Sequence, residues 1–451
     1  MQLTFMGATG TVTGSKYLLA SDSKKILIDC GLFQGYKELR LRNWSNLPID
    51  PHKIDAVILT HAHIDHSGYL PLLVKNGFSG KIYCSSATRD LCEILLRDSG
   101  HLQEEEARFA NEQGYSKHHP ALPLYTQEDA ERSLHFFHTV NFGLEYHLDD
   151  DLSFQLTRSG HILGSSFVRI KHHNRILLFS GDLGRPHDPV MNPPVIVQST
   201  DYLVLEATYG NRLHEAINPI DQLGKVITKT AKRGGSVIIP AFAVGRAQSI
   251  LYFIYQLKKT NKIPDIPVFL DSPMAVSATK IFCNYANEYK FSKQQCYDIC
   301  AGATYTNTVE ESKAIDNYQY PIIIISASGM ATGGRVLHHL KQFAQDYRNT
   351  ILFTGYQAGG TRGARMVNGE SEVKIHGQMI PIRAEVIELS NTSAHADYQE
   401  ILAWLKKITT PPIKTFITHG EPEAAQSLKN IIEKELAWDC EIPVYLQTEE
   451  L

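Results

Sequence analysis

The sequence predicts an α/β protein of two or three domains, with a mostly parallel sheet in its middle region. Its 451 residues exceed what one ordinary hydrophobic core supports. The composition is globular, with 43% hydrophobic and 20% charged residues and no low-complexity tract. In the middle region, short apolar runs alternate with helix-like segments, which is typical of parallel strands joined by crossover helices.

The first part of the chain alternates short strands with glycine-rich turns. We expect strands over residues 3–6, 17–20, 25–29, 56–59, 154–157, 167–171, 175–180 and 203–206, and helices over 89–113 and 128–138. Glycines Gly7, Gly10 and Gly14 resemble a dinucleotide-binding loop, but that motif needs a helix after the glycines. Because residues 16–20 read as a strand, we expect a hairpin here.

The middle and last parts continue with buried strands, each followed by a helix. We expect strands over 236–240, 267–270, 321–326, 350–354 and 415–418, another near Val386, and helices over 245–259 and 398–407 with a final helix at the end. His338 and His339 are predicted to be surface residues of a further helix.

Charge and cysteine usage restrict the class of partner and the compartment. The formal net charge of -4 gives no overall attraction to nucleic acid, so a polyanion would need a local basic groove or metal ions. The seven cysteines form no CxxC motif and predict reduced thiols, with Cys296 and Cys300 one helical turn apart. The first residues read as a strand without a leader, and no apolar run reaches membrane-spanning length. We expect a cytoplasmic protein without a membrane partner, and the sequence leaves room for a homodimer.

The most informative motif is a tight turn that carries His61, His63, Asp65 and His66 directly after the apolar run 56–59. Imidazole and carboxylate groups are ligands for zinc-like ions. A short rigid turn at a strand end can direct two pairs of such groups at two neighbouring ions. A polar loop that binds no metal is the alternative, and it is rare for this spacing.

Three further candidate ligands, His161, Asp182 and His419, each follow an apolar strand and lie beside a glycine that permits a sharp turn. The candidates divide into two sets, with His61, His63 and His161 for one ion, Asp65, His66 and His419 for a second, and Asp182 as the bridge. Each ion keeps an open position, as in catalytic sites, and a pair of ions would acidify a shared water. Asp29 follows a strand and either orients one of the histidines or simply ends the strand in a turn.

As a set, these residues resemble the metallo-β-lactamase superfamily. The motifs around Glu206 (residues 205–210), His395 (393–397) and His419 are similar to those of its β-CASP branch, which processes nucleic acids. The segments 240–246, 328–330 and 355–357 are similar to those of the RNA-cleaving members related to the endonuclease subunit of the cleavage and polyadenylation machinery and its prokaryotic relatives. The resemblance covers nearly the whole chain. One departure is Ala394 before His395, where several relatives have Ser-Gly-His.

This resemblance implies an αββα metallo-β-lactamase sandwich from residues 1–209 and 391–451, with an inserted α/β β-CASP domain over 210–390. It implies a two-zinc enzyme, with manganese as the alternative metal, that hydrolyses phosphodiester bonds of single-stranded RNA internally by an activated hydroxide. His395 would be the general acid and Glu206 would hold it, with Asp65 and Asp29 completing the catalytic set.

Several alternatives remain open at this stage. The nearest is a 5′-3′ exoribonuclease of the ribonuclease J type, and the others are a thioester or lactam hydrolase and a non-catalytic RNA-binding subunit. Glycine loops and strand ends carry the candidate RNA-binding residues Arg246, Ser328, Arg335, Arg362 and Arg365. Tyr209, Phe242 and Tyr356 could stack on bases, although such aromatics more often belong to a core.

Overall fold

The computed structural model describes residues 1–114, 116–215, 217–355, 357 and 359–451, which form two compact units. The first unit joins residues 1–188 and 192–213 to residues 395–451, and the second contains residues 189–191 and 214–394. Tyr356, one of the candidate base-stacking residues, lies outside the described residues.

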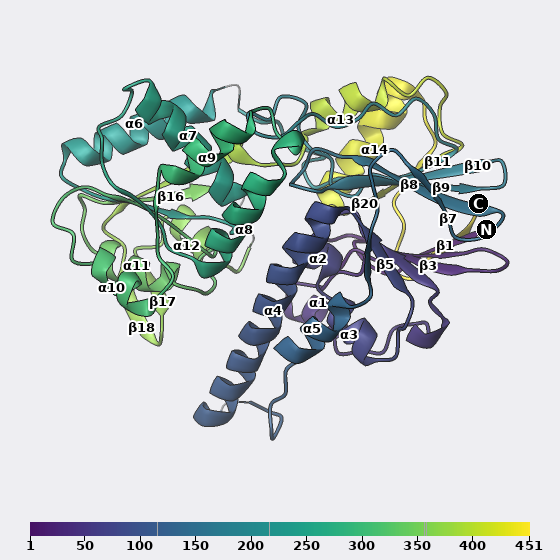
Figure 1. Ribbon diagram of the computed structural model, residues 1–451, viewed down its shortest axis with the longest axis horizontal. Coiled ribbons are helices and arrows are strands. Elements are labelled where there is room, and N and C mark those ends of the chain that lie inside the picture. Colours follow the sequence, from purple (N-terminus) through teal and green to yellow (C-terminus); the bar gives the residue numbers. More distant parts are fainter. Residues whose placement is uncertain (115, 216, 356, 358) are drawn as a thin grey trace. The chain divides into compact units, whose positions relative to one another are not determined.

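The first unit is a sandwich of two sheets with helices on both outer faces (Figure 1). In order across the first sheet, the strands are β22 (Thr448–Glu450), β1 (Gln2–Phe5), β2 (Tyr17–Ala20), β3 (Lys25–Ile28), β4 (Ala56–Ile58), β5 (Lys81–Cys84) and β6 (Phe137–Thr139). Across the second sheet they are β21 (Cys440–Glu441), β20 (Lys414–Thr418), β11 (Tyr202–Glu206), β10 (Arg175–Phe179), β9 (Ser166–His172), β8 (Leu152–Arg158) and β7 (Glu145–His147).

Each of these sheets has a parallel half and an antiparallel half. Strands β3 to β6 are parallel, and so are β10, β11, β20 and β21. Neighbouring parallel strands end at the same edge of a sheet, so the loops after β3 and β4 emerge together, as do those after β10, β11 and β20. These loops carry the polar motifs found in the sequence.

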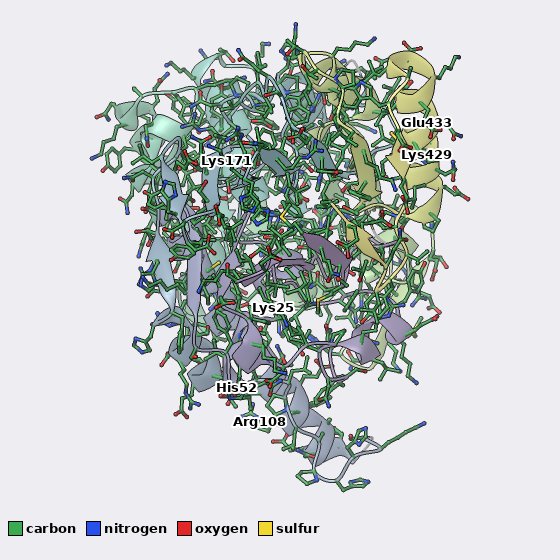
Figure 2. The ribbon with its side chains drawn as sticks, turned by 90° about the vertical axis from the view of Figure 1, so that its right-hand side faces the viewer. Lys25, His52, Arg108, Lys171, Lys429 and Glu433 are labelled. Carbon is green, nitrogen blue, oxygen red and sulfur yellow. The ribbon has the colours of Figure 1, made fainter. Side chains whose placement is uncertain are left out.

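The helices of the first unit cover the two outer faces of the sandwich. They are α1 (Lys37–Arg42), α2 (Ile64–Ser67), α3 (Leu70–Lys75), α4 (Ser86–Gln113), α5 (Gln127–Leu134), α13 (Tyr398–Leu405) and α14 (Pro422–Leu436), with a 3₁₀ turn η1 (Pro51–Lys53). Local signals fix their ends: Ser85 caps α4 by accepting the Thr88 N–H, and Gly114 ends it in the left-handed conformation. Figure 2 shows Lys429 and Glu433 together on α14, where they form an ion pair one turn apart.

The core of the sandwich lies between the two sheets. It contains Phe5 and Ile28 from the first sheet and Phe154, Phe179 and Phe416 from the second, all buried. Burial of each such side chain contributes about 1.5–3 kcal/mol relative to full exposure. A second cluster, with Leu205, Trp404 and Leu428 among its members, attaches α13 and α14 to the outer face of the second sheet.

The second unit is built on a six-stranded, fully parallel sheet. Its strands, in order, are β14 (Thr304–Tyr305), β13 (Val268–Leu270), β15 (Ile323–Ser326), β12 (Val237–Pro240), β16 (Thr350–Thr354) and β19 (Glu385–Leu389), and a separate hairpin is made by β17 (Glu372–Ile375) and β18 (Gln378–Pro381). Its helices are α6 (Pro219–Lys232), α7 (Arg246–Lys259), α8 (Pro273–Asn284), α9 (Lys293–Ala301), α10 (Val309–Ile315), α11 (Val336–Phe343) and α12 (Arg362–Val367), with 3₁₀ turns η2 (Ala286–Glu288) and η3 (Ser390–Thr392).

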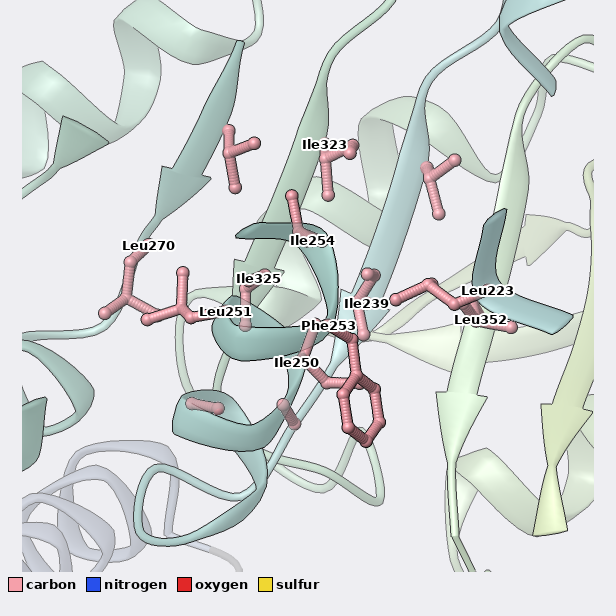
Figure 3. Close-up of a cluster of buried hydrophobic side chains, with 14 of the residues drawn as sticks. Leu223, Ile239, Ile250, Leu251, Phe253, Ile254, Leu270, Ile323, Ile325 and Leu352 are labelled. Carbon is pink, nitrogen blue, oxygen red and sulfur yellow. The ribbon is translucent and has the colours of Figure 1, made fainter. Parts of the chain in front are cut away.

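Two hydrophobic clusters hold this parallel sheet between its helices. On one face, Ile239, Ile323 and Ile325 of the sheet pack against Ile250 and Ile254 of α7 (Figure 3). On the other face, residues such as Ile324 and Phe353 pack against α11. Burial on both faces explains why these strands read as continuous apolar runs in the sequence.

The fold confirms the predicted class, an α/β sandwich with an inserted and mostly parallel α/β region, and it corrects two local predictions. The helix expected over residues 128–138 ends at Leu134, and Phe137–Thr139 is the edge strand β6. His339 is buried, whereas a surface position was predicted, because it faces the buried carboxylate of Asp271 at 2.6 Å. Among the described residues, every helix is too short or too polar to cross a lipid bilayer.

Candidate metal centre

The first unit brings seven histidine and aspartate side chains together at the ends of its strands. One group contains His61, His63, His161 and Asp182, and the other contains Asp65, His66 and His419. Within each group, the potential ligand atoms all lie within 4.8 Å of one another. These are the seven residues that the sequence proposed, in the same two sets.

In the first group, three nitrogens and one oxygen point at a common position. His63 Nδ1 lies 3.1 Å from His61 Nε2 and 3.3 Å from His161 Nε2. In the second group, His66 Nε2 lies 3.0 Å from His419 Nε2, which is 3.5 Å from Asp65 Oδ2.

Asp182 connects the two groups through its two carboxylate oxygens. Its Oδ2 lies 3.3 Å from both His61 Nε2 and His161 Nε2. Its Oδ1 lies 3.3 Å from His66 Nε2 and 3.6 Å from His419 Nδ1. One carboxylate therefore presents one oxygen to each group, which is the arrangement that a bridging ligand requires.

The strand ends and close backbone contacts fix these positions. His61 and His63 follow β4, Asp65 and His66 lie on α2, and Asp182 follows β10. Gly31 approaches the backbone of this turn so closely that a Cβ on it would lie 1.6 Å from the Asp65 carbonyl oxygen. Gly184 is equally constrained, because its Cβ would lie 2.0 Å from the Gly160 carbonyl carbon beside His161. Both glycines are thus needed for the loops to meet.

Burial and charge set the protonation of the cluster. Burial lowers the pKa of His61 to about 3, and it lowers the pKa of His63 and of His161 as well. These imidazoles are therefore neutral at physiological pH, with lone pairs free to bind a cation. Burial opposes charge on Asp65, but the neighbouring His419 and His66 outweigh it and lower the pKa of Asp65, which stays a carboxylate.

The donor set fits a divalent cation. Among the described residues, Asp182 Oδ1 is buried and accepts no well-aligned hydrogen bond, although His66 Nε2 lies 3.3 Å away. A buried carboxylate oxygen without a partner is costly in a folded protein unless a cation compensates it. Five imidazoles and two carboxylates in this cluster are ligands typical of zinc.

A hydrogen-bond network behind the cluster orients the histidines. Asp29 Oδ2 lies 2.7 Å from His66 Nδ1, and Asp29 Oδ1 accepts the Thr60 N–H at 2.7 Å. The Thr60 hydroxyl also contacts His61 Nδ1 at 3.0 Å, and the Thr208 hydroxyl lies 3.2 Å from His419 Nδ1. Asp29 was predicted from the sequence as a residue behind the cluster, whereas neither threonine was. The position of Thr60 directly before His61 was the available signal.

His395 and Glu206 form a pair beside the first group. His395 Nδ1 lies 3.1 Å from Glu206 Oε1, and the ring centroids of His395 and His161 are 4.4 Å apart. Glu206 is itself fixed, because it accepts the Leu183 N–H at 2.7 Å. Burial lowers the pKa of His395, but the charges of Glu206 and Asp182 outweigh burial and raise it to about 9. The Glu206 and Asp182 carboxylates therefore favour the protonated form of His395.

The candidate RNA-binding residues belong to the second unit, and most make internal contacts. Arg335 Nη1 lies 2.8 Å from Asp271, and its Nη2 donates to the Asn307 carbonyl. Arg362 donates to the carbonyls of Lys374 and Ala331. These guanidinium groups therefore also hold their own loops in place.

The other candidates differ in exposure and in contacts. Arg246 opens α7, and Arg365 pairs with Glu370. The Ser328 hydroxyl accepts the Thr332 N–H at 3.0 Å. Of the aromatics, Phe242 is 44% exposed, whereas Tyr209 is buried. Phe242 thus presents a ring to solvent, as a base-stacking residue must.

The fold and the histidine–aspartate cluster define a metallo-hydrolase type of architecture, a metallo-β-lactamase sandwich with an inserted parallel domain. Three family models match the chain: the metallo-β-lactamase superfamily over residues 9–219, the β-CASP domain over 247–366, and the Zn-dependent metallo-hydrolase RNA specificity domain over 379–443. The chain belongs to the β-CASP branch of the metallo-β-lactamase superfamily, as its motifs predicted.

Two relatives of similar length and one longer relative support this assignment, and a solved structure shares the fold. The chain is 34% identical to Ribonuclease TTHA0252 of Thermus thermophilus, over 96% of both chains. It is 30% identical to an RNase J-like protein of Methanocaldococcus jannaschii, over 98% of both. It is 32% identical to the transcription termination factor FttA of Methanosarcina mazei, over 99% of this chain and 71% of that protein. A crystal structure of a protein of unknown function from Enterococcus faecalis shares the fold, with a TM-score of 0.59 at 12% identity over 100% of this chain and 99% of that one.

Proposed function

We propose that this protein is a metal-dependent ribonuclease that hydrolyses internal phosphodiester bonds of single-stranded RNA. The main support is the position of the His395–Glu206 pair, which lies directly beside the metal-ligand cluster. The two halves of that cluster each face one oxygen of Asp182. Relatives named as ribonucleases, and the match to an RNA specificity domain, support RNA as the substrate class.

The cluster would hold two zinc ions, with manganese as the alternative metal. His61, His63 and His161 would bind the first, Asp65, His66 and His419 would bind the second, and Asp182 would bind both. When bound, the metal would supply Lewis acidity to a phosphoryl oxygen and to the attacking water. Because carboxylates are few in this set, zinc is favoured over magnesium.

His395 supplies the proton that the leaving oxygen of the RNA needs. Its Nδ1 is directed at Glu206, so Nε2 is the nitrogen that donates to substrate. Glu206 holds the ring in this orientation and keeps it protonated, while the Leu183 and Thr208 N–H groups hold the Glu206 carboxylate. Asp29 acts through Thr60 and His66 as a positioning residue. Arg246, Ser328, Arg335 and Arg362 remain proposals for RNA contact.

The test uses a circular single-stranded RNA, which an exonuclease cannot enter. We expect the zinc-loaded protein to linearise the circle, and His63→Ala to abolish the cut. Intact circles together with stepwise loss of a 5′-phosphorylated linear RNA would favour the 5′-3′ exoribonuclease instead, the reading that the RNase J-like relative supports. Inert RNA together with turnover of a thioester or lactam would replace the ribonuclease proposal altogether.

The zinc content, the oligomeric state and the cellular location can each be measured directly. Elemental analysis of the purified protein should find two zinc ions per chain. Light scattering decides whether the chain is a homodimer, and fractionation of the source cell decides the expected cytoplasmic location.

A further inference from the structure

Two cysteines of the second unit lie in unusually close contact. Cys283 is the penultimate residue of α8, and Cys300 lies in the last turn of α9. Their sulfur atoms are 2.9 Å apart. Other polar contacts of the same sulfurs are much longer, at 3.7 Å from Cys283 to the Cys296 carbonyl and 3.9 Å from Cys300 to the Thr279 carbonyl. The two thiols therefore face each other and not the surrounding backbone.

The pair is placed for thiol chemistry. Cys300 is partly exposed, whereas the other six cysteines are buried. The hydrogen bond from the Cys300 thiol lowers the pKa of Cys283, so this sulfur is more readily a thiolate than an isolated buried cysteine. An accessible sulfur in contact with a second sulfur of lowered pKa is the arrangement found in reversible dithiol sites.

The remaining contacts keep the two sulfurs together. The Tyr305 hydroxyl donates to the Cys300 carbonyl at 2.7 Å, which holds the end of α9. Phe282, next to Cys283, packs on Tyr289 with ring centroids 4.1 Å apart, which holds the end of α8. Both helix ends are thus fixed by their own contacts, with the two sulfur atoms 2.9 Å apart.

We propose that Cys283 and Cys300 are an oxidisable dithiol that forms an intramolecular disulfide by exchange with a low-molecular-weight disulfide. In the first step, a thiolate of the pair attacks one sulfur of the small disulfide, forms a mixed disulfide and releases one small thiolate. In the second step, the other cysteine loses its proton, attacks the protein sulfur of the mixed disulfide and releases the second small thiolate. Two protein thiols are oxidised to one disulfide, and the small disulfide is reduced to two thiols.

The bond would join α8 to α9 across a 17-residue separation that includes η2. Closing this loop restricts the unfolded chain, so the oxidised protein should melt roughly 5 °C or more above the reduced protein. α8 also contacts α7, where Gln248 Nε2 donates to the Thr279 hydroxyl at 2.9 Å. The cross-link would therefore restrain the helical layer α7–α9, which begins at Arg246.

The experiment treats the native full-length chain with hydroxyethyl disulfide at mildly alkaline pH. Remaining thiols are then alkylated in denaturant, and the peptides are mapped by mass spectrometry. We expect the thiol count to fall from seven to five, with one peptide pair joined through positions 283 and 300, and dithiothreitol to restore all seven.

Matched variants separate this pair from the other cysteines. Cys300→Ser should form no internal disulfide and should lose at most the one thiol that a mixed disulfide at Cys283 would occupy. Cys440→Ser, which removes a buried cysteine of the first unit, should still lose two. Retention of all thiols by the wild-type chain would overturn the proposal. So would arrest at a single mixed disulfide, a bond at other positions, or loss of two thiols in Cys300→Ser. The wild-type map decides the question even if a variant fails to fold.

Discussion

The substitution Glu206→Gln tests whether Glu206 keeps His395 protonated for catalysis. Glutamine has the same shape as glutamate and can still accept the Leu183 N–H through its carbonyl oxygen. It removes the negative charge that lies 3.1 Å from His395 Nδ1. The variant keeps the packing, but it loses the hydrogen bond from the Thr208 N–H as well as the charge, because the amide NH2 of glutamine cannot accept it.

The size of the effect follows from the pair itself. The pKa of His395 stands at about 9, against an ordinary value of 6.5. A hydrogen bond to a charged partner contributes about 1.5–3 kcal/mol, and about 1.4 kcal/mol corresponds to one pKa unit. Loss of the charge should therefore lower the pKa of His395 by about 1 to 2 units. The shift is not larger because the carboxylates of Asp182 and Asp65 remain in the variant and still raise the pKa of His395.

The assay is single-turnover cleavage of RNA across a range of pH at saturating metal. A general acid works only while it holds its proton, so the rate falls as pH rises through its pKa. We expect the alkaline limb of the wild-type profile to move about 1 to 2 pH units lower in Glu206→Gln, with a rate roughly two- to tenfold lower near pH 8. Glu433→Gln, on the exposed face of α14, is the matched control and should leave the profile unchanged. An alkaline limb that does not move in Glu206→Gln would refute the assigned role.

Two further predictions concern the network behind the cluster and the second unit. Asp29→Asn should weaken zinc binding by roughly 10- to 100-fold, measured in competition with a chelating dye, because it alters the contact that orients His66. The control Asp439→Asn, at an exposed position, should bind zinc as the wild type does. Equal zinc affinities of Asp29→Asn and the wild type would exclude the positioning role of Asp29. His339→Gln should lower the free energy of unfolding by about 2–3 kcal/mol near pH 6, since it removes a charged hydrogen bond from buried Asp271. Burial lowers the pKa of His339, but Asp271 and Asp316 outweigh it and raise the pKa above 6.5, so its stabilisation is complete below pH 6.5 and is lost as pH rises through the folded value. Urea unfolding should show this loss above pH 6.5 in the wild type but not in His339→Gln, and parallel pH profiles would contradict the assignment.

Much of the candidate site could be predicted because its signals are local. His61, His63, Asp65 and His66 lie on one turn, and an apolar strand precedes them directly. Imidazole and carboxylate side chains on one turn favour metal binding over other chemistry. Asp182 and His419 repeat the same pattern of an apolar strand followed by a ligand beside a glycine. The predicted bounds of α7 and β16 also agree closely with the structure, because the hydrophobic pattern of both segments is clear in the sequence.

Predictions failed where a residue's environment comes from distant parts of the chain. His339 has the local context of an exposed helical residue, yet Asp271, 68 positions earlier, buries its ring. No role was predicted for Thr60, because its hydroxyl reaches Asp29, which lies 31 positions away in the chain. The Cys283–Cys300 contact has no sequence signature, because it depends on how α8 packs against α9.

The sequence by itself determined the ligand types, the strand ends that carry them and the family, because each of these is written in short contiguous segments. Only the tertiary structure decided that the two oxygens of Asp182 face separate groups, that Glu206 contacts His395 across 189 positions, and that Cys283 meets Cys300. The physical reason is that protonation and reactivity depend on burial and on neighbouring charges. Both are fixed when strands and helices from remote parts of the chain pack together.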